Sequence, residues 1–95
     1  MLFVSLMKSK PGSTIADRTK RRLDWTYPQG MRVLAEYWLA GANPEVVLVS
    51  ESDDASTIYT AVRQWADMFE ITVTPAITAD VGLAQARELY ALALA

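Results

Sequence analysis

The chain has 95 residues, of which 52% are hydrophobic, and it carries a formal net charge of −2 without any cysteine or histidine. The length predicts a single domain over residues 1–95. The missing residue types exclude disulfides, thiolate nucleophiles, imidazole bases, imidazole-ligated haem and most zinc sites, so no metal and no cofactor are expected.

No apolar run approaches the ~18 residues of a membrane-spanning helix, and residues 1–7 lack the basic lead of a signal peptide. A cytoplasmic protein without membrane contact is therefore expected. The hydrophobic fraction is above the ordinary range for a small domain. It indicates a rich core or a face that a partner chain covers, and the partner is favoured because small sheet domains often leave one face bare.

The chain opens with a continuous apolar run over residues 1–7, which predicts a strand that ends before the breaker Pro11-Gly12. Thr14, with Asp17 three residues later, predicts the N-terminus of a first helix. Residues 8–24 hold six basic residues against two acids, so this helix is expected to be amphipathic with a basic outer face. Its apolar positions recur at near-helical spacing: Ile15, Thr19 and Leu23.

Alternation with period two predicts a strand over residues 31–40, and the β-branched run within residues 45–50 predicts the next one. Turn chemistry at residues 41–44 joins the two into an antiparallel hairpin. Residues 51–54 supply an N-cap and negative charge for a second helix over residues 55–68.

The apolar stripe of that second helix contains Trp65, which is predicted to lie in the core. Alternation returns over residues 69–75 and predicts a fourth strand. A last helix is expected over residues 79–94, appended to a core of residues 1–78.

The predicted order is strand, helix, strand, strand, helix, strand, which is the split βαβ arrangement of ferredoxin-like folds. The fold class is therefore α+β, with one four-stranded antiparallel sheet, two helices on one face and an appended C-terminal helix. The other face would be bare, so two copies are expected to pair through their sheets as a dimeric α/β barrel.

Strand parity predicts which side chains share each face. The more uniformly apolar set is expected under the helices: Leu2, Val4, Leu6, Val33, Ala35, Tyr37, Ile71 and Val73. The bare face would then carry a mixed set: Phe3, Ser5, Met7, Arg32, Leu34, Glu36, Trp38, Thr72 and Thr74. A second sheet packed over such a surface would enclose a partly polar space.

The segment Glu51-Ser52-Asp53-Asp54, then Trp65-Ala66-Asp67 and Glu70-Ile71 through Pro75, resembles a small bacterial family known as domain of unknown function 3303. The resemblance extends to about Thr78. That family is similar in outline to the dimeric α/β-barrel superfamily, whose members include cofactor-independent monooxygenases, isomerases and haem-degrading enzymes. The resemblance implies a fold and a homodimer, and it does not select a reaction.

The predicted ligand-binding residues are those of the mixed face: Arg32, Glu36, Trp38, Thr72 and Thr74. Arg32 could hold an anionic group, Glu36 could act as a base, and Trp38 could stack on a planar molecule. In the alternative interpretation Arg32 and Glu36 are ion-pair partners across a dimer, and Trp38 only packs. Trp25 and Tyr27 flank a Pro-Gly loop, where they could cover a pocket or close the core.

Three functions remain open from the sequence. The first is a small cytoplasmic dimer that binds a small molecule in or beside the barrel. The second is a cofactor-independent monooxygenase or isomerase. The third, nucleic-acid binding through the basic first helix, has least support, because such a charge run is usually a solvated helix face. Base stacking on the sheet is not favoured either, because the strand within residues 45–50 has no aromatic residue.

Overall fold

The computed structural model describes residues 1–41 and 43–94, with side chains up to residue 92; Ala42, in the predicted hairpin turn, lies outside them. Four strands and three helices follow one another in this part of the chain: β1 Leu2–Ser9, α1 Ile15–Asp24, β2 Arg32–Trp38, β3 Val46–Glu51, α2 Ala55–Trp65, β4 Phe69–Ala76 and α3 Ala79–Leu94.

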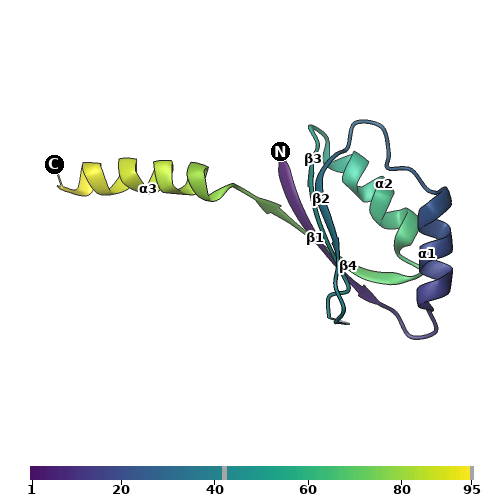
Figure 1. Cartoon of the computed structure of the whole chain (residues 1–95). Helices are drawn as coiled ribbons and strands as arrows, with labels where there is room; N and C mark the ends of the chain where they lie inside the picture. Colours follow the sequence, from purple (N-terminus) through teal and green to yellow (C-terminus); the bar gives the residue numbers. More distant parts are fainter. Residues whose placement is uncertain (42, 95) are drawn as a thin grey trace.

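The strands form one antiparallel sheet in the order β2-β3-β1-β4. Helices α1 and α2 cover one face of this sheet, whereas α3 extends away from the body on the other side (Figure 1). The order β-α-β-β-α-β-α makes this the α+β, ferredoxin-like fold that the sequence predicts. No helix within residues 1–41 and 43–94 is both long and apolar enough to cross a membrane.

Side-chain caps fix where the two packed helices begin. Thr14 is the N-cap of α1, and its hydroxyl accepts a hydrogen bond from the Asp17 amide at 3.1 Å. Asp54 is the N-cap of α2, and its carboxylate accepts one from the Ser56 amide at 2.9 Å. Both caps stand where the sequence predicts them, because an oxygen-bearing side chain satisfies amides that the first turn leaves unpaired.

The core lies between α2 and the central strands. Leu48 of β3 is 2% exposed, and Ile58 and Trp65 of α2 pack in the same layer together with Phe3 and Phe69. Serines are buried in this layer as well: Ser5, Ser50 and Ser52. Ser5 and Ser50 lie on the helix-covered face of the sheet, and Ser52 follows the end of β3.

The predicted parity of β1 is wrong. Phe3 and Ser5 are buried beneath the helices, whereas Leu6 is 41% exposed on the bare face together with its parity mates Leu2 and Val4. The uniformly aliphatic set therefore faces outward. Its uniformity was misleading because the bare face also carries aliphatic side chains, while the helix-covered face accepts small polar residues.

The parity of β2 is right at its start and wrong after a β-bulge. Val33 pairs with Ser50 and Ala35 pairs with Val49, so Leu34 is an extra residue without a partner on β3. A bulge of this kind shifts the alternation by one position. Ala35 and Tyr37 consequently lie on the bare face.

Beyond the same bulge, Glu36 and Trp38 point towards the helices, as their pairing with Leu48 and Val46 requires. In β4 the prediction is confirmed: Ile71 and Val73 lie on the helix-covered side and Thr72 and Thr74 are exposed opposite them.

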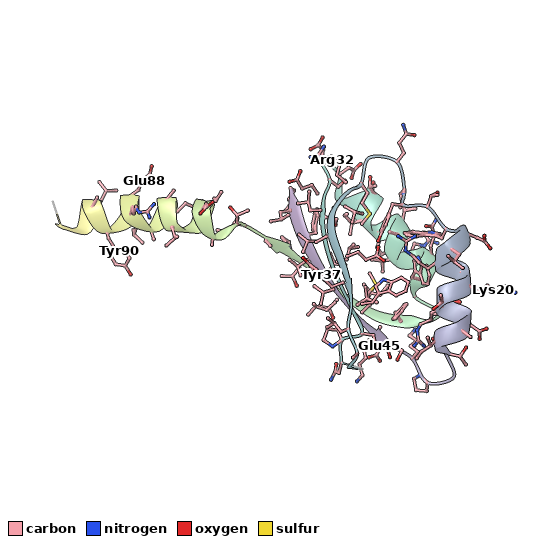
Figure 2. All side chains as sticks on the ribbon, viewed as in Figure 1. Lys20, Arg32, Tyr37, Glu45, Glu88 and Tyr90 are labelled. Carbon is pink, nitrogen blue, oxygen red and sulfur yellow. The ribbon has the colours of Figure 1, made fainter. Side chains whose placement is uncertain are left out.

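The expected basic outer face of α1 is also wrong for its arginines. Arg18 is the buried residue of this helix, and Arg21 and Arg22 turn inward beside it. Ile15 and Leu23, predicted to be apolar contacts, are 75% and 80% exposed. Lys20 of the same helix projects away from the body (Figure 2).

Candidate functional site

A cavity of about 180 Å³ lies between the helix layer and the sheet. Its walls come from α1, the α1–β2 connection, α2 and all four strands. The lining combines aromatic rings with two arginines and two glutamates: Trp25, Tyr27, Trp38, Trp65, Phe69, Arg18, Arg22, Glu36 and Glu45. A site with apolar walls and a few convergent polar groups is the usual form of a small-molecule pocket.

The polar centre of this cavity is the carboxylate of Glu36, which accepts hydrogen bonds from three side chains. Arg22 reaches both of its oxygens, with Nε at 3.3 Å and Nη2 at 3.2 Å. The Trp38 indole donates at 2.7 Å, and the Tyr27 hydroxyl donates to Oε1. Donors from α1, the α1–β2 connection and β2 therefore converge on one carboxylate.

This arrangement fixes the protonation states of the centre. Partial burial raises the pKa of Glu36, but the hydrogen bonds from Arg22, Tyr27 and Trp38 outweigh it, so the net pKa lies below its ordinary value. Burial, followed by the hydrogen bond to Glu36, raises the pKa of Tyr27 far above its ordinary value. At neutral pH the centre thus holds an ionised carboxylate beside a neutral phenol.

Aromatic rings and the Arg22 guanidinium form one side of the cavity. Trp25 packs edge-on against Tyr27 and Trp65, with ring centroids 4.6 and 5.5 Å apart. The Arg22 guanidinium carbon lies 5.2 Å from the Tyr27 ring centroid and 5.9 Å from that of Trp25. These contacts hold the planar groups in place.

A second ion pair lies where α1 meets the β2–β3 hairpin. Arg18 binds Glu45 at 2.9 Å and also donates to the carbonyl and hydroxyl oxygens of Ser13, each at 2.8 Å. Ser9 donates a further hydrogen bond to Glu45. The positive and negative charges that line the cavity therefore balance.

The five predicted ligand-binding residues do not come together. Glu36 and Trp38 lie in the cavity. Arg32 is on the other side of the sheet, where it pairs with Glu51 at 2.6 Å. Thr72 and Thr74 are exposed on that same bare face. The bulge at Leu34 puts Arg32 and Glu36 on opposite faces of the sheet, so the prediction that these two residues share one face is wrong.

Arg18, Arg22 and Glu45 are cavity residues that the sequence reasoning missed. Arg18 and Arg22 are four residues apart and thus share one side of α1 with Trp25. This pairing of arginines with an aromatic residue was a signal for an inward polar face. It was hidden by the general expectation that basic residues on a helix face solvent.

Within residues 1–41 and 43–94, no group of three or more acidic side chains is placed to hold a metal ion. 

Comparisons with known proteins give a family but no characterised relative. No curated protein and no solved structure matches the chain. The family match spans residues 1–90, so it takes in most of α3 as well as the core and reaches beyond the Thr78 limit that the sequence resemblance gave. The chain belongs to the family described as domain of unknown function 3303.

Proposed function

We propose that the protein binds a small planar molecule, a single ring bearing a hydroxyl group, in the cavity between its helices and its sheet. The main support for this proposal is the Glu36 carboxylate, which is ionised inside a cavity of about 180 Å³ with aromatic walls. The site differs from the predicted one, because it lies under the helices instead of between two sheets.

The size of the cavity limits the ligand. An apolar protein cavity of ~150 Å³ holds benzene, whereas drug-sized molecules occupy ~300–1,000 Å³. A cavity of about 180 Å³ therefore fits one ring with one or two small substituents.

The chemistry of the lining supports a hydroxyl on that ring. Glu36 is an acceptor, and the Trp38 indole that donates to it belongs to a side chain that is 59% exposed. A ligand hydroxyl can take the place of the indole donor, and Trp38 can then cover the ring. Arg22 and Tyr27 keep their bonds to Glu36 and hold it in place.

The same centre favours binding over proton transfer. A carboxylate whose pKa is lowered is a weak base, and a phenol whose pKa is raised is a weak acid. General acid–base catalysis near neutral pH needs the opposite adjustment of both groups. The monooxygenase or isomerase alternative therefore gains no support from Glu36 and Tyr27.

Nucleic-acid binding through α1 gains little support from the structure. Arg18, Arg21 and Arg22 are each engaged by an acid from another element, namely Glu45, Asp67 and Glu36. These pairs offset three of the six basic charges that would otherwise attract phosphates.

We also infer that the protein is a homodimer in which a second copy covers the bare face of the sheet. This face exposes large apolar side chains beside threonines and an ion pair, and Leu34 and Tyr37 on it are 55% and 59% exposed. Monomeric proteins seldom leave large contiguous apolar surfaces in water. A two-fold dimer buries the same surface on both copies.

Ligand binding is tested by titrating p-cresol into the protein and following tryptophan fluorescence, with toluene as the matched ligand that lacks the hydroxyl. The wild type should bind p-cresol more tightly than toluene by about tenfold, the equivalent of one charge-assisted hydrogen bond. In Glu36→Gln that preference should shrink severalfold, because the acceptor loses its charge.

Glu70→Gln, which removes an exposed carboxylate on β4, is the control and should keep the preference. If wild type and Glu36→Gln showed the same preference for p-cresol over toluene, the proposed role of Glu36 would be wrong.

A further inference from the structure

Helix α3 is built to pack against something, yet its described side chains find no cover on the body of the protein. Leu89 and Tyr90 are each 65% exposed, and Leu83 is 51% exposed. Helical spacing places these residues with Ala86 on one side of α3, away from the charged side that carries Arg87 and Glu88. Figure 2 shows Tyr90 and Glu88 on opposite sides of the helix.

A lone helix of this kind is not self-supporting in water. It has 16 residues, barely more than the ~12–15 below which isolated helices are marginal even in alanine-rich sequences. Gly82 near its start weakens it further, since glycine costs about 1 kcal/mol relative to alanine in a helix. The helix therefore needs tertiary packing of its apolar side to persist.

The bare face of the sheet offers a groove of matching chemistry. The groove has a volume of about 670 Å³ and mostly apolar walls, which include Met1, Leu2, Leu34, Val49, Ala76 and Ile77. Val81 of α3 stands at its rim, and from there α3 leads away from the sheet (Figure 1). The helix thus begins beside this groove without filling it.

We propose that α3 is an exchanged arm, and that the groove on the bare face is the docking site for α3 of a second copy. This inference rests on the proposed dimer and adds the element that holds it together. Under two-fold symmetry each arm fills the other copy's groove, so the groove and the side of α3 with Leu83, Leu89 and Tyr90 are covered on both copies.

The areas agree with this arrangement. Four strands at ~4.8 Å spacing, with about seven residues of ~3.3 Å rise, give the bare face a projected area of roughly 440 Å². A helix of this length adds roughly 240 Å², from ~1.5 Å rise per residue and a width of ~10 Å. The arm thus brings the contact much closer to the ~800 Å² that each partner buries in a standard interface.

Single-cysteine variants test the exchange directly, because the chain has no cysteine of its own. The full-length Leu34→Cys protein is mixed with an equal amount of full-length Leu89→Cys or Ala86→Cys protein under mild oxidation. If the arm lies in the partner's groove, these mixtures should form a covalent heterodimer at least tenfold faster than a mixture of Leu34→Cys with Ala91→Cys. The cysteine of Ala91→Cys lies on the charged side of α3. Equal rates for both sides of the helix would contradict the docking of its apolar side.

The double variant Leu34→Cys/Leu89→Cys separates exchange from folding back. Exchange predicts a disulfide-linked dimer, whereas a closed monomer would overturn the exchanged arm. Sedimentation of the wild type separates the two proposals. If the wild type is a dimer but the variants give no cross-link, the exchanged arm is wrong and the sheet dimer stands. If the wild type is a monomer at micromolar concentration, both proposals are wrong.

A matched pair of charge substitutions gives a second readout without cysteine. Leu89→Glu should raise the dissociation constant of the dimer by about tenfold or more, because it places a carboxylate in the apolar contact. Ala91→Glu adds the same group on the charged side and should leave the constant within about twofold. Equal effects of the two variants would contradict the exchanged arm.

Discussion

Arg18, Arg21 and Arg22 point from α1 towards the body, and each meets an acid from another element. Arg18 binds Glu45 where both are largely buried, and its guanidinium also lies 5.6 Å from the Phe69 ring centroid. Arg21 makes two hydrogen bonds to Asp67, at 2.7 and 2.8 Å, in a more exposed position. Guanidinium groups suit this place because they combine flat packing surfaces with forked donors.

Loss of Arg18 should destabilise the protein more than loss of any exposed charge on α1. Arg18→Met keeps the aliphatic stem but leaves Glu45 without its cation, and we expect a cost of about 3 kcal/mol in the free energy of unfolding. Urea denaturation measures this cost. Lys20→Met, on the exposed side of the same helix, should change it by less than about 0.5 kcal/mol.

Adding Glu45→Gln to Arg18→Met should recover part of the lost stability, because the uncompensated charge disappears. A double variant no more stable than Arg18→Met would show that the pair contributes through packing and not through charge.

Glu36 should make stability depend on acidity. Its pKa is lower in the folded protein than the ordinary value of ~4.3 expected in the unfolded chain, so the folded state binds the proton less readily. Its contribution is complete above the unfolded pKa and is lost as the pH falls through the folded one. As the pH falls from about 5 to about 2.5, the temperature of thermal unfolding should therefore decline less steeply in Glu36→Gln than in the wild type.

Glu70→Gln serves as the control and should retain the steep decline of the wild type. Superimposable pH profiles for wild type and Glu36→Gln would contradict the hydrogen-bonded carboxylate at the centre of the cavity.

At the scale of elements, the α1–β2 connection places Tyr27 over the sheet. Its last turn closes through the Met31 amide, which donates to the Pro28 carbonyl at 3.2 Å. Gly30 adopts a φ of +92°, a conformation that side-chain-bearing residues rarely take. A Cβ at this position would meet Thr57 at an ordinary distance of 3.8 Å, so backbone conformation, and not space, requires the glycine.

Gly30→Ala should therefore cost about 1–2 kcal/mol in the free energy of unfolding, the price of a left-handed backbone at an alanine. Gly41→Ala is the matched control, since a Cβ there meets nothing within 4 Å and its φ lies outside the left-handed region. It should be neutral within about 0.5 kcal/mol. Chemical denaturation compares the two, and an equal response would contradict the strained turn.

The order and class of the elements were predictable because local signals determine them. The caps at Thr14 and Asp54, and the alternation in β2 and β4, depend on neighbouring residues alone. The face of the sheet that each side chain of β1 occupies was not predictable, because both alternating sets of residues in β1 are compatible with burial. Burial of Ser5 beneath the helices depends on which face the helices cover, which is a tertiary property.

The site was only half predictable for a related reason. The sequence correctly placed Glu36 and Trp38 on the same face of one strand, because residues that are two positions apart in a strand point to the same side. Arg32 was wrongly joined to them, since a strict period of two cannot reveal the extra residue at Leu34. The arginine partner of Glu36 comes instead from α1, across a contact that strand periodicity cannot report.

At the scale of the whole molecule, the chain divides its apolar surface between two places. One part closes around the cavity beneath α1 and α2. The other remains outside, on the bare face of the sheet and along α3, which gives the protomer its long dimension of 58 Å. The proposed dimer covers the second part, while the proposed ligand fills the first, so the two functions occupy opposite faces of one sheet.

The cavity can be examined most directly by crystallography of the full-length protein soaked with p-cresol. We predict electron density for the ring between α1 and β2, with its hydroxyl at hydrogen-bonding distance from Glu36 and Trp38 moved to cover it. Density for the ring only on the bare face of the sheet, or an empty cavity in crystals of a protein that binds p-cresol in solution, would contradict the account.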